Sequence, residues 1–175
     1  VEEGTYNLES VLAPGKNIEV SGNNFDSGAG TILYTADEEK SNQRFEIVST
    51  GDGYYNIIAE HSGKALEAVG DVSAGYTYIQ QKDRDSSSQA QKWEFYYAGD
   101  GNYYIRSALG TNMDVYSGAA TNGNMIWTYT GNQTVSQRWK LEWSEHQPLD
   151  DGTYTISNSN NLIVNVASAS IDNYA

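Results

Sequence analysis

One short pattern occurs three times in this sequence: a glutamine, then a basic residue, then a large aromatic residue. Successive glutamines lie 48 and 46 residues apart (91−43, 137−91). A period of this length restricts the chain to folds assembled from equivalent units, because each unit must bury its apolar face against its neighbours. The three copies are Gln43-Arg44-Phe45, Gln91-Lys92-Trp93 and Gln137-Arg138-Trp139.

Three other features repeat in the same order within each copy. A Gly-x-Tyr-x-Ile/Leu pattern opens the copy, at residues 4–8, 53–57 and 101–105. An apolar, an acidic and a small residue follow, at residues 18–20, 66–68 and 113–115. An isoleucine comes next, as Ile32, Ile79 and Ile126. Four ordered features in three successive copies establish a true internal repeat.

Each copy has the pattern of four short strands. Tyr6 and Leu8 alternate with polar neighbours, as do Tyr103 and Ile105, which is the period-two signature of a half-buried strand. No stretch of a dozen residues shows a helical period. The sequence therefore predicts an all-β chain of twelve strands, closed in threefold fashion because closure removes exposed strand edges. The predicted core consists of Phe45, Trp93, Trp139, Ile32, Ile79 and Ile126.

Composition excludes several classes of function. The 175 residues can bury one substantial core but are too few for two ordinary domains. A formal charge of −13 should repel nucleic acids and anionic membranes, whereas neutral ligands are compatible with it. There is no cysteine, and no apolar run approaches the roughly 18 residues that span a bilayer. We therefore expect no disulfides and no membrane insertion.

The repeated Gln-x-Trp pattern at the end of each copy, with the Leu-Asp-Val-like pattern before it, resembles the ricin B-chain type of β-trefoil lectin. The sequence is most similar to the cysteine-free versions found in bacterial cell-surface and carbohydrate-active proteins. The resemblance covers residues 4–143, about four fifths of the chain. It implies a β-trefoil with pseudo-threefold symmetry, built from repeats 4–50, 51–99 and 100–143.

The end of the chain restarts the pattern. Residues 152–156 match the opening strand of a repeat, and residues 163–166 match its second feature. The sequence stops at Ala175, before any counterpart of the later features. We interpret 144–151 as a linker and 152–175 as the truncated start of a fourth repeat in a longer array.

A sugar site of this family needs an acid that accepts hydrogen bonds from sugar hydroxyls, an aromatic ring that stacks on the pyranose, and a further polar group. In the third repeat the resemblance implies that Asp114 is the acid, Tyr129 the stacking ring and Asn132 the amide. It also implies that Gln137 holds the aspartate. Trp127 stands where the family commonly has glutamine, and is either a second platform or an inward-facing side chain.

The first and second repeats look degenerate. In the first, the acid is Glu19 and Thr35 holds the expected stacking position, although Asn42 keeps the family's asparagine. In the second, the acid is Glu67 and Lys82 holds the stacking position. Glutamate is one methylene longer than aspartate, which moves the carboxylate by more than a hydrogen bond tolerates. The third repeat is therefore the one expected to bind sugar.

The leading hypothesis is a non-catalytic carbohydrate-binding module of a larger secreted or cell-surface bacterial protein, located outside the cell or on its wall. Its partners would be neutral glycans, of galactose or xylose type, and neighbouring modules that add avidity. No cofactor or metal is expected, since none of the acidic runs matches a spaced calcium loop.

Two other hypotheses remain open. The chain could be a structural spacer or a protein-interaction trefoil whose sugar sites have decayed, which the first two repeats favour. It could also be a fragment of an enzyme whose catalytic domain lies elsewhere. Within this sequence His61 and His146 are far apart and neither has a nucleophile motif beside it, so we expect no catalysis by these residues.

Overall fold

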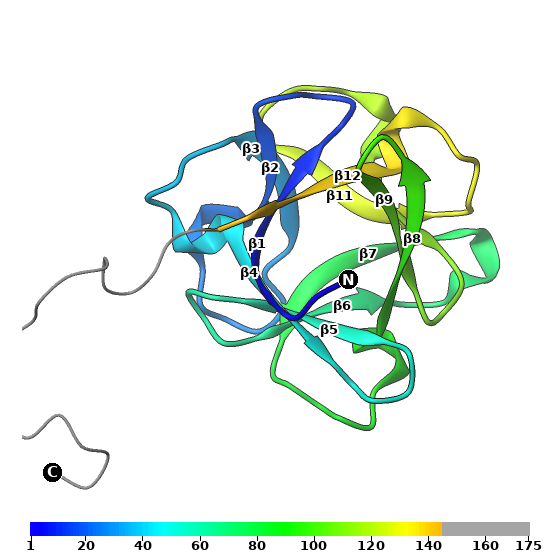
Figure 1. Ribbon diagram of the computed structural model, residues 1–175. Coiled ribbons are helices and arrows are strands. Elements are labelled where there is room, and N and C mark those ends of the chain that lie inside the picture. The colour runs from blue at the N-terminus through cyan, green and yellow to red at the C-terminus, as the bar shows by residue number, and fades with distance from the viewer. Residues whose placement is uncertain (145–175) are drawn as a thin grey trace, which may run out of the picture. The chain divides into compact units, whose positions relative to one another are not determined.

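The structure is a computed structural model that describes residues 1–144. These residues form twelve strands, four in each repeat (Figure 1). The first repeat contains β1 (Gly4–Ser10), β2 (Lys16–Val20), β3 (Thr31–Thr35) and β4 (Arg44–Ser49). The second contains β5 (Tyr55–Ala59), β6 (Ala65–Val69), β7 (Tyr76–Lys82) and β8 (Trp93–Gly99). The third contains β9 (Asn102–Ser107), β10 (Asn112–Val115), β11 (Asn124–Tyr129) and β12 (Arg138–Trp143). The prediction of an all-β trefoil is confirmed.

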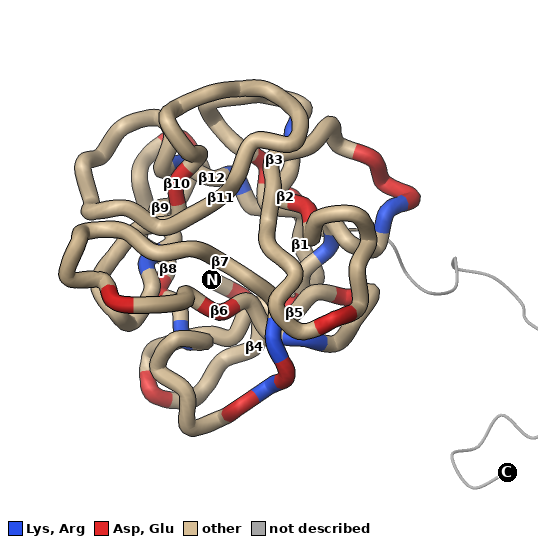
Figure 2. The backbone as a smooth tube through the Cα atoms, turned by 180° about the vertical axis from the view of Figure 1, so that it is seen from behind, with Lys and Arg blue, Asp and Glu red and all other residues tan. Residues whose placement is uncertain are grey.

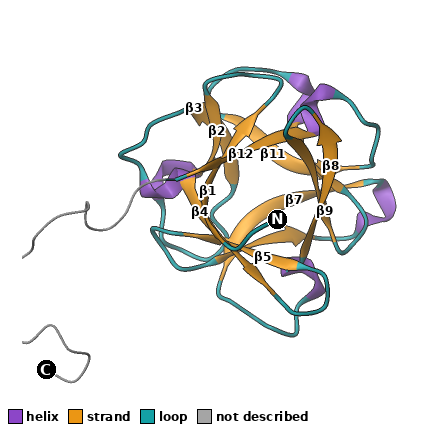
Figure 3. Cartoon of the chain, in the orientation of Figure 1, coloured by secondary structure: helices purple, strands orange, loops and turns teal. Residues whose placement is uncertain are grey.

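Six single 3-10 turns complete the repeats, and Figure 3 shows them outside the strands. One turn follows the second strand of each repeat, and another comes directly before its last strand. The first set is η1 (Ser21–Asn23), η3 (Val72–Ala74) and η5 (Tyr116–Gly118). The second set is η2 (Ser41–Gln43), η4 (Gln89–Gln91) and η6 (Val135–Gln137), and each ends on the repeated glutamine.

Six of the strands close into an antiparallel barrel. The order of pairing is β1, β4, β5, β8, β9 and β12, and β12 pairs with β1 again. The other six form three hairpins, β2–β3, β6–β7 and β10–β11. Strand β11 also pairs with both β3 and β7, so the hairpins meet one another. The strands therefore pair with other strands of the same chain, which leaves few unpaired edges exposed.

Each repeat contributes one buried ring to the core. Phe45, Trp93 and Trp139 have no exposed surface. The indole N–H of Trp93 donates to the carbonyl oxygen of Leu66 at 3.0 Å, and that of Trp139 donates to Met113 at 3.1 Å. A buried indole thus fills the core and also satisfies a strand carbonyl. The predicted burial of these rings, and of Ile79 and Ile126, is confirmed.

The prediction that Ile32 belongs to the core is wrong. Its side chain is half-buried, while its neighbour Leu33 is the one with no exposed surface. Strand β3 pairs with β2 so that Ile32 lies opposite Glu19, the acid of its repeat. The same place holds Gln80 in the second repeat and Trp127 in the third. A shift of one residue in a strand moves a side chain to the other face.

The repeated glutamines bond to the backbone of the loop that precedes them. The amide of Gln43 donates to the carbonyl oxygen of Thr35 at 2.9 Å, and its oxygen accepts from the backbone N–H of Asp37 at 3.0 Å. Gln91 and Gln137 make the corresponding pairs of bonds. Each glutamine is almost fully buried. It therefore fixes the path of the loop between the third and fourth strands of its repeat.

The predicted partial fourth repeat, 152–175, lies outside the described residues, as does the predicted linker after Ser144. No helix among residues 1–144 has the length and apolar composition that crossing a bilayer requires. Figure 2 shows acidic positions in all three repeats, with fewer basic positions between them. The whole chain carries 23 acidic against 10 basic residues, so its field favours neutral or cationic ligands.

Candidate functional site

The three family acids occupy one equivalent place, near the end of the second strand in each repeat. All three are largely buried, with 5%, 8% and 5% of their surface exposed in chain order. In each hairpin the residue directly across from the acid comes 13 positions later in the sequence. The acids are Glu19, Glu67 and Asp114, and their cross-strand partners are Ile32, Gln80 and Trp127.

A buried glutamine holds the acid in the first two repeats. Nε2 of Gln43 donates to Oε2 of Glu19 at 2.8 Å, and Nε2 of Gln91 donates to Oε2 of Glu67 at 3.1 Å. The same glutamines are tied to the backbone of the adjacent loop. In these two repeats the acid, the loop and the last strand are therefore linked through one side chain.

In the third repeat, the indole of Trp127 lies over the acid. Its N–H donates to Oδ1 of Asp114 at 3.0 Å. The indole stacks on Tyr129, with ring centroids 5.3 Å apart and planes 21° from parallel. It also contacts the rings of Tyr76 and Tyr116, at 5.2 and 4.8 Å between centroids. Trp127 is thus held within an aromatic cluster rather than standing free as a platform.

The remaining residues expected in this site lie around the same loop. Tyr129 is 37% exposed at the end of β11, and Asn132 is exposed in the loop that follows. Oδ1 of Asn132 accepts from the backbone N–H and the hydroxyl of Thr134, at 3.1 and 2.9 Å. Its side-chain nitrogen makes no hydrogen bond within residues 1–144. The structure brings Asp114, Trp127 and Tyr129 together, with Asn132 nearby on the glutamine-held loop.

Burial raises the pKa of Asp114 above its ordinary value, although hydrogen bonds from Trp127 and Gln137 oppose the change. Desolvation penalises the ionised carboxylate, and the two bonds recover only part of that cost. An acid kept at a cost to the fold is a common property of binding sites.

We expect Asp114→Asn to stabilise the protein near neutral pH. The folded-state pKa is raised, so the ionised carboxylate lowers stability above that pKa, and the penalty disappears below the unfolded-state pKa of about 4. Asparagine keeps an oxygen for the Trp127 indole but carries no charge. Urea unfolding across a pH series is the measurement. The gain should shrink as the pH falls, and a loss of stability that grows with pH would contradict this account.

The first repeat departs from the sequence-based expectation. Thr35 was expected in the stacking position, but this is wrong by one residue. Strand pairing puts Tyr34 opposite Asn17, which is the place of Tyr129 opposite Asn112 in the third repeat. The first repeat therefore has an aromatic ring in the same position relative to its acid. Counting 15 residues from Glu19, the interval that separates Tyr129 from Asp114, finds this ring, whereas aligning the isoleucines does not.

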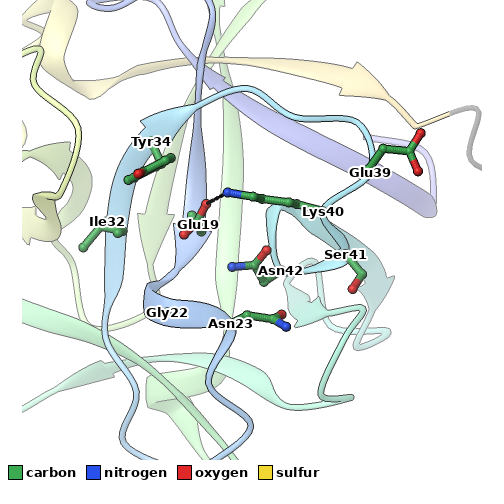
Figure 4. Close-up of a pocket in the computed structure, with 9 residues that line it drawn as sticks. All are labelled: Glu19, Gly22, Asn23, Ile32, Tyr34, Glu39, Lys40, Ser41 and Asn42. Carbon is green, nitrogen blue, oxygen red and sulfur yellow. Dashed lines mark ion pairs between the residues drawn. The ribbon is translucent and has the colours of Figure 1, made fainter.

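A pocket of about 400 Å³ opens at this place (Figure 4). Glu19 from β2 and Tyr34 from β3 line it together with Asn23 of η1 and Asn42 of η2. Asn42 donates from Nδ2 to the carbonyl oxygen of Val20 at 2.9 Å, and it is buried. The first repeat thus combines an acid, a ring and amide groups around a cavity large enough for a small ligand.

Lys40 reaches into the first-repeat pocket from the loop before η2. Its ammonium lies 3.7 Å from Oε2 of Glu19 and 4.9 Å from the centroid of the Tyr34 ring (Figure 4). The side chain of Lys40 is 41% exposed, whereas that of Glu19 is 7% exposed. No sequence pattern indicated this contact, because it depends on the path of the loop.

In the second repeat a lysine takes the place of the ring. Lys82 lies opposite Ala65, the position that holds tyrosine across from Asn17 and Asn112, and its ammonium lies 3.5 Å from Oε1 of Glu67. Nε2 of Gln80 donates to the same oxygen at 3.1 Å. The acid is therefore engaged by neighbouring side chains, and the stacking position holds no aromatic ring.

Comparison with known proteins places all three repeats in one family. A family model described as a ricin-type beta-trefoil lectin domain-like domain matches residues 1–82, 41–129 and 89–175. Flavastacin from Elizabethkingia meningoseptica is 29% identical over 143 residues, which are 81% of this chain and 32% of flavastacin. The chain therefore spans about a third of the length of this relative.

Two solved structures show the same trefoil. The designed 3-fold symmetric protein ThreeFoil is 28% identical with a TM-score of 0.74, and the match covers 79% of this chain and 98% of ThreeFoil. An exo-beta-1,3-galactanase from Clostridium thermocellum is 28% identical with a TM-score of 0.71, over 80% of this chain and 30% of the galactanase. The chain is thus similar both to a free-standing trefoil and to part of a larger enzyme.

Proposed function

The chain belongs to the family of ricin-type beta-trefoil lectin-like domains, and we propose that it is a non-catalytic carbohydrate-binding module. The observation that carries the proposal is the same arrangement in two repeats. A buried acid lies across from the third strand of the repeat, and a tyrosine lies two residues further along that strand. An acid beside a tyrosine ring that is exposed (Tyr129) or half-buried (Tyr34) can accept bonds from sugar hydroxyls while the ring stacks on the apolar face of the sugar.

The third repeat supplies the first of these sites. Asp114 would accept from two neighbouring hydroxyls, Tyr129 would stack on the ring, and Asn132 would donate from its free amide nitrogen. Gln137 holds the loop that carries Asn132, through its bond to the backbone N–H at 3.1 Å. Trp127 would fix the carboxylate and form one wall. Its packing against neighbouring tyrosines supports a rigid site.

Neutral glycans of galactose or xylose type are the proposed ligands of this site. The structurally similar galactanase is named for its action on a galactan, which favours the galactose type. The chain matches only about a third of that enzyme and of flavastacin, which supports a role as one part of a larger protein. We propose a secreted or cell-surface bacterial parent, in which neighbouring modules add avidity to a weak site.

Asp114→Ala is expected to weaken sugar binding by about 1.5–3 kcal/mol, the usual contribution of hydrogen bonds to a charged group. Tyr129→Ala should also weaken it, through loss of stacking. The measurement is an NMR titration with galactose and xylose, followed at the backbone amides of residues 126–133. Glu67→Ala is the matched control, because the second repeat has an acid but no ring. Titration shifts at those amides that persist unchanged in Asp114→Ala would contradict the proposal.

A second candidate function is a structural spacer or protein-interaction trefoil. It is favoured by the contacts that the acids already make, with Trp127 on Asp114, Lys82 on Glu67 and Lys40 on Glu19. In this candidate function, these contacts permanently occupy the positions on the acids that sugar hydroxyls would take. A well-folded sample that binds no saccharide on a glycan array would support this candidate and overturn the first.

A further inference from the structure

The first-repeat pocket already holds an ammonium group, that of Lys40. The group lies 3.7 Å from the Glu19 carboxylate and 4.9 Å from the centre of the Tyr34 ring. A carboxylate and the face of an aromatic ring are the two features that recognise a cation in proteins, by charge and by cation–π attraction. The pocket is therefore suited to a ligand that carries a positive charge.

We propose that this pocket binds an unacetylated amino sugar, whose protonated amine takes the place of the Lys40 ammonium. The inference rests on the proposed carbohydrate-binding function, and it assigns a ligand class to one site. The amine would lie between Glu19 and Tyr34. The sugar ring would extend over Tyr34, toward the amide groups of Asn23 and Asn42 that line the same pocket.

The exchange is possible because the two partners of Lys40 are fixed while Lys40 is not. Glu19 is held by the 2.8 Å bond from Gln43, and Tyr34 lies within a paired strand. Lys40 sits in a loop with 41% of its side chain exposed, and an ion pair at such a site contributes little. Oε1 of Glu19 accepts no hydrogen bond within residues 1–144, so it remains available to the ligand.

The size and polarity of the pocket favour a sugar over a simple amine. Its volume of about 400 Å³ lies in the range of small-molecule sites. Asn42 uses Nδ2 to bond Val20, and its side-chain oxygen makes no hydrogen bond among the described residues. That oxygen can accept from a sugar hydroxyl. N-acetylation would remove the positive charge and add bulk, so acetylated sugars should bind poorly here.

Charge also favours a cationic ligand at this place. Lys40 is the one basic residue among those that line the pocket, while Glu19 and Glu39 are both acidic. When Lys40 moves out, the pocket keeps two carboxylates and no basic side chain. The whole chain adds a formal charge of −13, which attracts cationic ligands over longer distances.

The other two repeats lack this combination. In the second, Lys82 stands where the ring should be, so a ligand amine would find the acid but no aromatic face. In the third, an indole N–H rather than an ammonium lies on the acid, and neighbouring rings hold it there. Only the first repeat joins an acid, a ring and a displaceable ammonium.

Titration calorimetry with glucosamine and N-acetylglucosamine tests the proposal. At about pH 6 the sugar amine is protonated and carboxylates are ionised. We expect measurable binding of glucosamine and at least about tenfold weaker binding of the acetylated sugar, as loss of a charge-assisted bond implies. Lys40→Met, which keeps the length of the stem, should tighten glucosamine binding about three- to tenfold by removing the internal competitor.

Glu19→Gln should abolish the preference for the amine while keeping an acceptor for the site's hydrogen bonds. Glu67→Gln is the matched control, since it removes the same charge from a repeat without a ring. Equal weakening by the two variants would mean that only the overall negative charge attracts the amine, and it would overturn the proposal. Unchanged glucosamine affinity in Lys40→Met would also overturn it. Glucosamine binding that depends on Glu19, without neutral-sugar shifts at residues 126–133, would support this inference and overturn the neutral-glycan site.

Discussion

Replacing Trp93 with alanine is expected to lower the free energy of unfolding by about 3–5 kcal/mol, as large-to-small changes in a core do. The indole has no exposed surface, so its removal leaves a cavity that the barrel strands around it cannot close. The change also removes the N–H that donates to the carbonyl oxygen of Leu66 at 3.0 Å, and it leaves that buried acceptor without its partner. Urea unfolding monitored by circular dichroism gives the measurement.

Trp143→Ala is the control for this prediction. The same side chain is removed, but Trp143 is 54% exposed, so we expect a loss of about 1 kcal/mol or less. A cost at Trp93 no greater than that at Trp143 would mean that the repeated aromatic position is not the centre of the core. The equivalence of the three repeats would then lose its main energetic support.

The positions of the core rings could be predicted because they follow from the repeat itself. Trp93 and Trp139 end their copies of one pattern, and equivalent units of a closed fold bury equivalent positions. The strand register within each hairpin, by contrast, does not follow from the spacing of the repeats. The three isoleucines are evenly spaced in sequence, yet Ile32 faces a surface pocket while Ile79 and Ile126 are buried.

The wrong placement of Ile32 arises because the first repeat is one residue longer than the second, as the intervals of 48 and 47 residues between successive acids show. The interval from each acid to its cross-strand partner is constant at 13 residues, because both lie in one hairpin. The spacing of the isoleucines is instead measured between repeats, so it changes with the length of a repeat. The error moved the stacking position from Tyr34 to Thr35, so the first repeat looked degenerate when its ring was present.

The side chains that contact the acids could not be predicted from the sequence. Lys40 reaches Glu19 from a loop, and Trp127 reaches Asp114 across a strand pair. Both contacts depend on side-chain rotamers and on the path of the backbone, which no residue pattern specifies. The expectation of an acid at each equivalent position was sound. The side chain that contacts each acid decides which ligand the acid can accept, and only the structure identifies that side chain.

Gln91→Leu should lower the free energy of unfolding by about 2–4 kcal/mol, because leucine fills the space but leaves several polar groups unpaired. The buried amide donates to Glu67 at 3.1 Å and to the carbonyl oxygen of Asp83 at 3.0 Å. Its oxygen accepts from the backbone N–H of Asp85 at 2.9 Å. The loss should be large even though the second repeat has no stacking ring, since the amide fixes the loop whether or not a ligand binds.

Gln89→Leu is the matched control, in the same 3-10 turn but with an exposed side chain, and we expect it to change stability by about 0.5 kcal/mol or less. Chemical denaturation of both variants gives the comparison, and sugar titration at the third repeat should be unchanged in either. If Gln91→Leu proved as mild as Gln89→Leu, the buried amide would not be what fixes the loop of the second repeat. A large loss with binding intact would show that the amide ties the acid, the loop and the last strand of the second repeat into one unit.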